Sequence, residues 1–387
     1  MLSTVGLSST LDCSLYAQPQ NGPNLPRSYP LFPADTAFSH FSPEKQRSHS
    51  STCSLHAFQQ AIVHHRFDTL RDSVLLAHQS PTLSQQLKAM RAPFEIHQDA
   101  LWKGSVGSVF PGQWFPHPSE EQGLPVAIKA ISKKVRGSRI RTLTREVKGA
   151  LIMYRLAPDA GVRLLDVYLD HPTHWFLIME RGIMSLEDYI RKVTQPPYMT
   201  LQGDDEPKVH ILSESILRDA MVRVILGLDQ LYRAGSVHGD IKPANLILFH
   251  TKDNSLTIKL ADFGLFRSSQ DPDFHHYYQG TPAFKPHGFK LGTPLTHKHF
   301  MTVDTYALIL TIHYALYAPR DDPLFSLSEH PNHPTISVSS FPHRAISPSL
   351  QRIFQTILVY EAWLNHPTSL RDMMTLLREW MAESLSG

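Results

Sequence analysis

The hydrophobic and polar positions along this 387-residue chain change character near residue 93. Residues 1–55 are rich in Ser, Pro, Gln, Asn and His, a composition that cannot sustain a packed core. From Leu55 to His78 apolar residues recur at roughly helical spacing, which fits either a helix or a fortuitous amphipathic stretch. We therefore predict an N-terminal extension over residues 1–92, largely disordered with a helix at 55–78, followed by one folded domain over residues 93–384.

Beyond residue 93, strand patterns come first and helical patterns follow. Strands are expected at residues 94–101, 109–115, 126–131, 162–169 and 175–179, with a helix at 143–156 between the third and the fourth. Further helices are expected at residues 185–193, 213–234, 350–364 and 368–380. Residues 194–210 are expected to be an exposed insertion. This order predicts an α+β fold.

Two of the helical patterns are the clearest. The helix at 213–234 has apolar residues at three- and four-residue steps and ends at Gly235; they are Ile216, Leu217, Met221, Val224, Ile225, Leu228 and Leu231. Another helix begins at Thr302–Leu308 and is apolar on nearly every side, which predicts a buried central helix.

Composition and charge narrow the class of protein. An apolar content of 42% and a net charge of +2 allow one large core and create no strong field for nucleic acid or membrane. The two cysteines, Cys13 and Cys53, precede the folded domain, so no disulfide framework supports it. The 23 histidines show no metal-site spacing. Because no apolar run approaches membrane-spanning length and the first basic residue is Arg27, we expect an intracellular protein, cytoplasmic or nuclear, without a secretory or transit peptide.

The strongest chemical signal is the loop 238–246 (H-G-D-I-K-P-A-N-L), followed by Asp262-Phe263-Gly264. An Asp and an Asn five residues apart in a tight loop, with a second Asp after one more hairpin, can place one base and two metal ligands around a nucleotide's phosphates. Asp240 is the candidate base, and Asn245 and Asp262 are the candidate Mg²⁺ ligands. The spacing predicts phosphoryl transfer.

This loop resembles the catalytic loop H-R-D-x-x-x-x-N and the D-F-G motif of eukaryotic-type protein kinases. Gly239 in the second place also resembles small-molecule phosphotransferases of the same fold, whereas Lys242 resembles serine/threonine protein kinases. Residues 280–287 resemble G-T-P-x-Y-x-A-P-E, the end of an activation segment that starts at Asp262 and that small-molecule phosphotransferases lack. The resemblance implies a two-lobed, protein-kinase-like α+β fold, with a small antiparallel-sheet lobe over 93–180 that carries one helix, and a larger, mostly helical lobe over 183–384.

The remaining motifs of the family lie upstream in the expected order. Leu101–Val109 resembles the glycine-rich loop over the phosphates, with Trp102 in place of its first glycine. Val126–Lys129 matches V-A-I-K, whose Lys reaches the α- and β-phosphates, and Glu146 is the expected ion-pair partner of Lys129. Met179 stands at the gatekeeper position and Glu180–Gly182 resembles the adenine-binding hinge. The nucleotide contacts that the resemblance implies are Leu101, Gly104, Gly107, Val109, Ala127, Lys129, Met179, Glu180, Gly182 and Ile247.

The resemblance also implies roles in the reaction. Asp240 would accept or orient the proton of the substrate hydroxyl, and Lys242 would stabilise charge on the transferred phosphoryl group. The hydroxyl of Thr281 would bond both of them. Asp304, in the buried helix, would hold the loop 238–246 from behind; a first-turn Asp that the helix dipole favours explains the same position.

Three departures from the family pattern change the expected regulation and specificity. Gly239 replaces the Arg that binds an activation-segment phosphate, so we expect activity without that phosphorylation. His287 and His366 stand where relatives have a Glu–Arg pair, so both halves of a buried ion pair are lost together, which avoids the roughly 3–5 kcal/mol cost of orphaning one charge. Ala244 replaces an acidic residue of basophilic kinases, so a basic substrate motif is not indicated.

We interpret the chain as a serine/threonine protein kinase that uses ATP and Mg²⁺ and acts on protein substrates with Ser or Thr acceptors. Two alternatives stay open. One is a pseudokinase scaffold, which the departures from the family pattern at Trp102, Gly239 and His287 allow. The other is a kinase-fold small-molecule phosphotransferase. A regulatory partner could bind the N-terminal extension or the basic segment 133–148, although a solvated helix face is the simpler explanation of that segment.

Overall fold

The computed structural model describes residues 82–97, 100–103, 107–116, 122–133, 138–194, 212–271, 277–286, 294–317, 346–358 and 369–383. Several of the expectations above lie outside these residues; they are the helix at 55–78 with the rest of residues 1–81, most of the insertion at 194–210, Gly104, His287 and His366.

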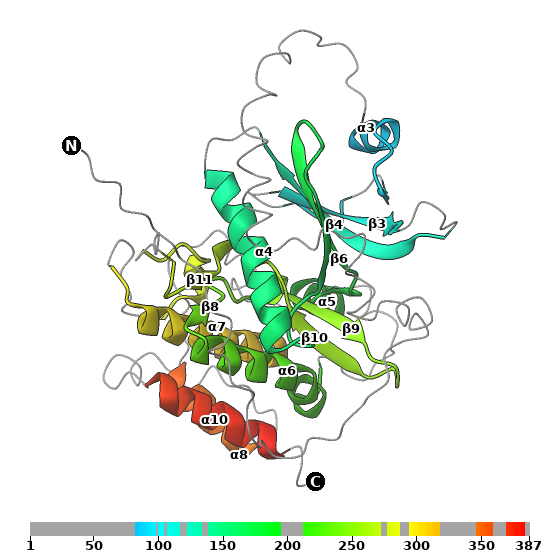
Figure 1. The fold of residues 1–387 in the computed structure, drawn as a ribbon. Helices are drawn as coiled ribbons and strands as arrows, with labels where there is room; N and C mark the ends of the chain where they lie inside the picture. The colour runs from blue at the N-terminus through cyan, green and yellow to red at the C-terminus, as the bar shows by residue number, and fades with distance from the viewer. Residues whose placement is uncertain are drawn as a thin grey trace, which may run out of the picture.

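An antiparallel sheet forms the small lobe (Figure 1). Its strands are β1 (Phe94–Ile96), β2 (Trp102–Lys103), β3 (Gly107–Trp114), β4 (Leu124–Ser132), β5 (Leu164–Tyr168) and β6 (His174–Glu180). They pair in the order β1-β3-β4-β6-β5, with β2 alongside β3. Helix α4 (Ser138–Leu156) follows β4 and packs against both this sheet and the large lobe.

Alternate residues of β4 belong to opposite faces of the sheet. Val126, Ile128 and Ala130 share a buried cluster with residues of β1, whereas Ile131 packs in a second cluster with residues of α4. Lys129, two residues before Ile131, therefore lies on the face toward α4. The strand period thus directs the one charged residue of β4 toward the helix.

A helix that the sequence patterns did not predict, α3 (Leu83–Ala89), precedes β1. Thr82 caps it through a reciprocal pair of hydrogen bonds with Gln85. Leu87 is 1% exposed and lies in the same buried cluster as Phe94 and Phe176. The packed structure therefore includes residues before 93, where the domain was expected to begin.

We expect Leu87→Ala to lower the free energy of unfolding by about 2–5 kcal/mol, because it empties a fully buried site. A chain that begins at Pro81 keeps the Thr82 cap and should melt like the parent and retain its activity, since the composition of residues 1–80 predicts neither a phosphate ligand nor a packed core. Thermal melts of the parent, the truncated chain and Leu87→Ala check this. Equal melting temperatures for the parent and Leu87→Ala would show that α3 does not stabilise the small lobe.

The large lobe is mostly helical. Its elements are β7 (Met184–Ser185), α5 (Leu186–Thr194), α6 (Glu214–Arg233), β8 (Ser236–Val237), β9 (Leu246–His250), β10 (Leu256–Leu260), β11 (Arg267–Ser268), α7 (His297–Tyr317), α8 (Pro348–Ile357) and α10 (Leu370–Ala382). Short 3₁₀ turns lie at Pro243–Asn245, Phe263–Leu265 and Pro282–Phe284. Strands β10, β9 and β7 form one antiparallel sheet, and β11 pairs with β8. The two-lobed α+β fold is therefore confirmed.

Helix α7 is the buried central helix that its apolar pattern predicted. Every residue from Val303 to Tyr317 is buried, and the helix begins at His297, ahead of the expected start at Thr302. The helix predicted at 213–234 is confirmed as α6; of its seven periodic apolar residues six are buried, and Ile216 is 48% exposed. This residue lies in the first turn of α6, where regular spacing does not tell which side faces the core. The expected end of α6 at Gly235 is confirmed by a φ of +67° at that glycine.

The strand predicted at 94–101 is interrupted. Its first part ends at Ile96, and a separate short strand, β2, starts at Trp102. His97 and Leu101 still donate backbone hydrogen bonds to β3, so the chain meets that strand at two separate places. No helix in the part of the chain described here combines the length and the apolar character needed to cross a membrane.

Candidate active site

One buried carboxylate holds the loop 238–246 in place. Asp304 of α7 is 1% exposed; its Oδ2 accepts the backbone N–H of His238 at 2.7 Å and its Oδ1 accepts that of Gly239 at 3.0 Å. Burial raises the pKa of Asp304 to about 7, and the two backbone donors oppose that rise. Asp304 thus lies behind the loop, where the resemblance placed it.

Gly239 is required by both backbone conformation and space. Its φ is +89°, in the region that favours glycine, and an added Cβ would lie 2.5 Å from the carbonyl oxygen of Leu265. The loop 238–246 and the segment that follows Asp262 therefore approach each other too closely for any side chain at this position.

Asp240, Lys242 and Thr281 form one hydrogen-bonded network. The Oδ1 atom of Asp240 accepts the backbone N–H and the hydroxyl of Thr281, both at 2.8 Å. The Nζ atom of Lys242 donates to Thr281 Oγ1 at 2.9 Å and lies 2.8 Å from Asp240 Oδ2. The side-chain amide of Asn245 donates to the main-chain oxygen of Asp240 at 2.8 Å and to its Oδ2 at 3.2 Å. The loop and the activation segment thus meet at the candidate base.

We expect Thr281→Ala to lower kcat by about 10-fold or more, because it removes a hydrogen bond to each of two charged groups. Thr281→Ser keeps the hydroxyl and is the matched control. Steady-state kinetics of dephosphorylated protein check this, since the effect should not depend on a phosphate. A Thr281→Ala variant with the parent's kcat would show that the hydroxyl does not position Asp240 or Lys242.

Lys129 lies between two carboxylates. Its Nζ atom is 2.9 Å from Glu146 Oε2 and 2.9 Å from Asp262 Oδ1. Lys129 and Glu146 are each 3% exposed. The predicted ion pair of β4 and α4 is therefore present, and Asp262 is a further partner of Lys129 that the patterns did not predict.

The protonation states in this cluster follow from burial and charge together. Burial would lower the pKa of Lys129, but the charges of Asp262 and Glu146 outweigh it and hold that pKa above its ordinary range. Burial opposes ionisation of Asp262 as well, yet the Lys129 ammonium keeps this pKa well below its ordinary range. Burial raises the pKa of Glu146 to about 7 against the attraction of Lys129. At neutral pH Asp262 is therefore ionised, as a metal ligand must be.

His238, for which the motifs predict no role, joins the loop 238–246 to the Asp262 segment. Its Nδ1 accepts the backbone N–H of Asp240 at 3.3 Å, so its Nε2 carries the proton and donates to the carbonyl oxygen of Ala261 at 3.0 Å. Its ring lies 5.0 Å from that of Phe263. On α4, a Cβ at Gly149 would lie 2.7 Å from Phe263, so that helix packs directly on the phenylalanine. Packing therefore links α4, which carries Glu146, through Phe263 to the loop.

The residues expected around an adenine ring come from both lobes. Ala127 of β4 is paired with Met179 of β6, and Val109 of β3 is paired with Lys129. Ile247 of β9 lies against the hinge, because a Cβ on Gly182 would be 2.4 Å from its Cγ2. These residues therefore lie where the lobes join.

Glu180 contributes to the hinge in a way that the sequence did not indicate. Its carboxylate lies 2.7 and 2.9 Å from Lys259 Nζ and accepts the backbone N–H of Arg163 at 2.7 Å. The Glu180 side chain is thus bound to Lys259 of β10 and to the backbone of Arg163, just before β5. The backbone N–H of Glu180 is also used, because it donates to the carbonyl oxygen of Arg163 at 3.0 Å, so neither this N–H nor the carboxylate is available to an adenine.

Three of the four nucleotide contacts expected in the phosphate loop are described, and Val109 is the one already placed in β3. Leu101 is 56% exposed. Gly107 is the first residue of β3, and an added Cβ would lie 2.2 Å from the carbonyl oxygen of Ala130. Gly107 is therefore required for the close approach of β3 to β4, a reason separate from access to a phosphate. Gly104 is not among the described residues.

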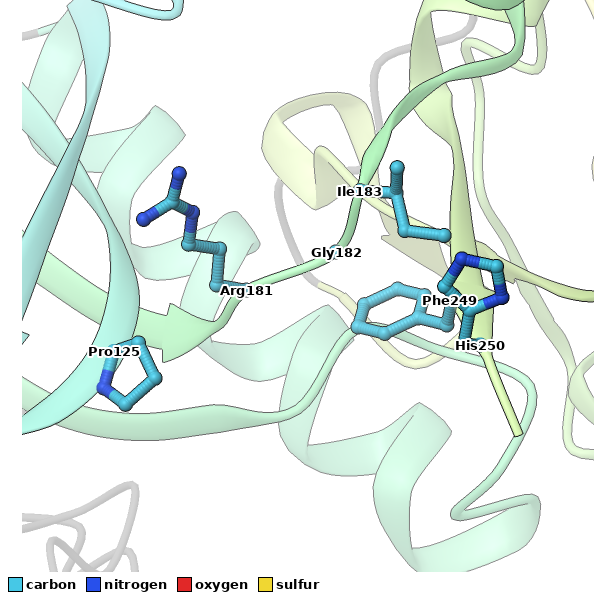
Figure 2. Close-up of a pocket in the computed structure, with 6 residues that line it drawn as sticks. All are labelled: Pro125, Arg181, Gly182, Ile183, Phe249 and His250. Atoms are coloured by element: carbon cyan, nitrogen blue, oxygen red, sulfur yellow. The ribbon is translucent and has the colours of Figure 1, made fainter. Parts of the chain in front are cut away.

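A cavity of about 280 Å³ lies beside the hinge (Figure 2). Its lining residues are Pro125, Arg181, Gly182, Ile183, Phe249 and His250. Of the expected nucleotide contacts it includes only Gly182, and neither Asp240 nor Asp262 lines it. The cavity is thus a recess at the hinge. The candidate active site is a different place, around Asp240 and Asp262.

The two candidate metal ligands lie on adjacent segments. The backbone N–H of Ala261, next to Asp262, donates to the main-chain oxygen of Asn245 at 2.8 Å. Within the described ranges, no group of three or more His, Cys, Asp or Glu side chains could hold a metal ion. Any cation at Asn245 and Asp262 would therefore need further ligands from a substrate or from water.

Two cations of the basic segment 133–148 already have partners within the chain. Lys133 donates to the carbonyl oxygen of Leu169 at 2.9 Å and lies over the ring of Trp175. Lys148 forms an ion pair with Asp271. These two side chains do not contribute to a free basic surface.

Comparison with known proteins agrees with this geometry. The chain matches the protein kinase domain family over residues 97–338, more than half of its length. Serine/threonine-protein kinase unc-51 of Caenorhabditis elegans is 29% identical over 195 residues, which is 48% of this chain and 20% of that protein. Serine/threonine-protein kinase PLK4 of Nematostella vectensis is 27% identical over 288 residues, which is 70% of this chain and 25% of that protein.

The chain spans a quarter or less of the length of these two relatives. From the match over residues 97–338, together with the two lobes and the Lys129–Glu146 ion pair, we conclude that this chain belongs to the protein kinase family.

Proposed function

We propose that the chain is a serine/threonine protein kinase that transfers the γ-phosphate of Mg-ATP to hydroxyl groups of protein substrates. The network of Thr281 with Asp240 and Lys242 carries the proposal. It joins the candidate base to an activation segment, against which a polypeptide substrate can lie. The names of the similar proteins, which are serine/threonine-protein kinases, support the same choice.

The residues of the chain have separate tasks in this reaction. Asp240 is within hydrogen-bond reach of groups on the activation segment and would accept or orient the proton of the substrate hydroxyl. Lys242, 2.8 Å from Asp240 Oδ2, would stabilise charge on the transferred phosphoryl group. Lys129, fixed by Glu146, would position the α- and β-phosphates.

The donor set fits Mg²⁺. Asp262 offers an ionised carboxylate, and Asn245 an amide oxygen that accepts no hydrogen bond from the described residues, because the amide nitrogen is turned to Asp240. Mg²⁺ binds through few protein oxygens together with substrate phosphates, which agrees with a site of two ligands. When bound, it would neutralise charge on the phosphate oxygens.

Transfer of labelled phosphate from ATP to a peptide library with Ser, Thr or Tyr acceptors tests the proposal. We expect labelling of Ser and Thr peptides with no gain from basic flanking residues, since Ala244 offers no acidic contact. Labelling of hydroxylated metabolites alone would indicate a small-molecule phosphotransferase. Thermal stabilisation by nucleotide without any transfer would indicate a pseudokinase scaffold.

A further inference from the structure

The activation segment is anchored next to its start by a carboxylate of its own. The described parts of this segment are residues 262–271 and 277–286. Asp271, at the end of the first part, accepts the backbone N–H of Ser268 on Oδ2 at 2.9 Å and contacts Lys148 Nζ with Oδ1. Its own N–H donates to the carbonyl oxygen of Ser268 at 3.0 Å. The two bonds to Ser268 close a tight turn after β11 and aim the carboxylate at α4.

Lys148 connects this turn to the core of the site. It lies on α4 two residues after Glu146, which holds Lys129, and one residue before Gly149, which packs on Phe263. The Lys148 and Asp271 side chains are 23% and 26% exposed, so solvent screens the pair only in part. The Lys148–Asp271 ion pair therefore restrains α4, and the position of α4 sets the distance between Lys129 and Glu146.

In the second described part of the segment, residues 277–286, two neutral oxygens bind Arg267. Arg267 is 2% exposed and donates from Nη2 to the carbonyl oxygen of Tyr277 at 3.1 Å and to Gln279 Oε1 at 3.3 Å. Its guanidinium also lies over the ring of Phe300. All of these partners are groups of the chain itself, and Gly239 has no side chain that could receive a phosphate.

We propose that Asp271 is a positioning residue: its carboxylate, paired with Lys148, holds α4 and the start of the activation segment in the arrangement that joins Lys129 to Glu146, without phosphorylation. The proposal rests on the kinase activity proposed above. It assigns to a fixed negative charge of the chain the task that a phosphate commonly performs, which is to order an activation segment by pairing with a cation.

A double-mutant cycle on phosphatase-treated full-length protein tests this. We expect Lys148→Met and Asp271→Asn each to lower kcat about fivefold or more, and the double variant to lower it no further than either single variant, because both remove one interaction. Asp271→Glu should restore most of the rate. Arg352→Met, which removes one half of an exposed pair with Glu379 between α8 and α10, is the control and should leave kcat and melting temperature unchanged.

Two kinetic outcomes would overturn the proposal. One is a large loss of activity when the parent is dephosphorylated, which would point to a phosphate held by another basic residue such as Arg267. The other is a double variant whose loss equals the product of the two single losses, because independent effects multiply in rate.

Hydrogen exchange without nucleotide separates this proposal from the kinase activity itself. Lys148→Met and Asp271→Asn should exchange faster than the parent in α4 and at residues 267–271, with melting temperatures close to the parent's. If the parent transfers no phosphate to any peptide, the proposed function fails while faster exchange still supports the anchoring. Unchanged exchange and unchanged kcat in an active protein would overturn the positioning role alone.

Discussion

Asp262→Asn is expected to reduce phosphate transfer to less than about a hundredth of the parent's rate while the protein stays folded. The substitution keeps the volume of the side chain and removes the ionised oxygen that a Mg²⁺ ion would bind. Asp262 has a φ of +63°, a left-handed conformation that Asn tolerates better than other residues with a side chain, so backbone strain should not confuse the result. Lys129 keeps Glu146 as a buried partner.

Labelled-phosphate assays and thermal melts of Asp262→Asn and of a control, Asp253→Asn, measure this effect. Asp253 is an exposed residue in the turn between β9 and β10, where Asn is readily accommodated. Activity near the parent's in Asp262→Asn would contradict the assignment of this residue as a metal ligand. Equal losses in both variants would point to a general effect of removing a negative charge.

Asp240→Asn is expected to lower kcat by roughly 10²–10⁴-fold, because it removes the group that we propose accepts the hydroxyl proton. An amide at this position can still accept the N–H and the hydroxyl of Thr281 through its oxygen. Its nitrogen cannot replace Oδ2, which accepts from Lys242 and Asn245 in the parent, so part of the loss in kcat comes from these two contacts. The KM for ATP should change little, because Asp240 is not among the residues expected to contact the nucleotide.

Steady-state kinetics over a range of ATP and peptide concentrations distinguish the two parameters. An Asp240→Asn variant whose only defect is a raised KM for ATP would show that Asp240 binds the nucleotide and does not act on the substrate hydroxyl. A variant with the parent's kcat would remove Asp240 from the reaction altogether.

The parts of the site that sequence alone predicted are those whose residue types and order repeat across a family. Lys129 and Glu146 could be paired because each stands in a recognisable motif, and the structure places them 2.9 Å apart. Thr281 could be assigned to Asp240 for the same reason, although 41 residues separate them. The hydrophobic pattern also predicted that α7 is buried, because a helix that is buried on all sides has a nearly continuous apolar sequence.

The parts that sequence did not predict depend on contacts between segments that carry no motif. Asp271 is 123 residues from Lys148, and neither residue type nor spacing connects them. Helix α3 has a capping box, but one buried residue, Leu87, is too little to produce a helical period in so short an element. The ion pair of Glu180 with Lys259 likewise depends on how β6 and β10 approach each other, which no sequence motif indicates.

The close approach at Gly239 also constrains how this chain can change over generations. A lineage that gained an arginine at position 239 by one substitution would first have to displace the carbonyl of Leu265, 2.5 Å from where the new Cβ would lie, and abandon a φ of +89°. Such a variant would lose stability before it gained any new control. A single substitution at position 239 therefore cannot add control by a phosphate bound next to Asp240 without a loss of stability, so new regulation is easier to gain at other surfaces of the domain.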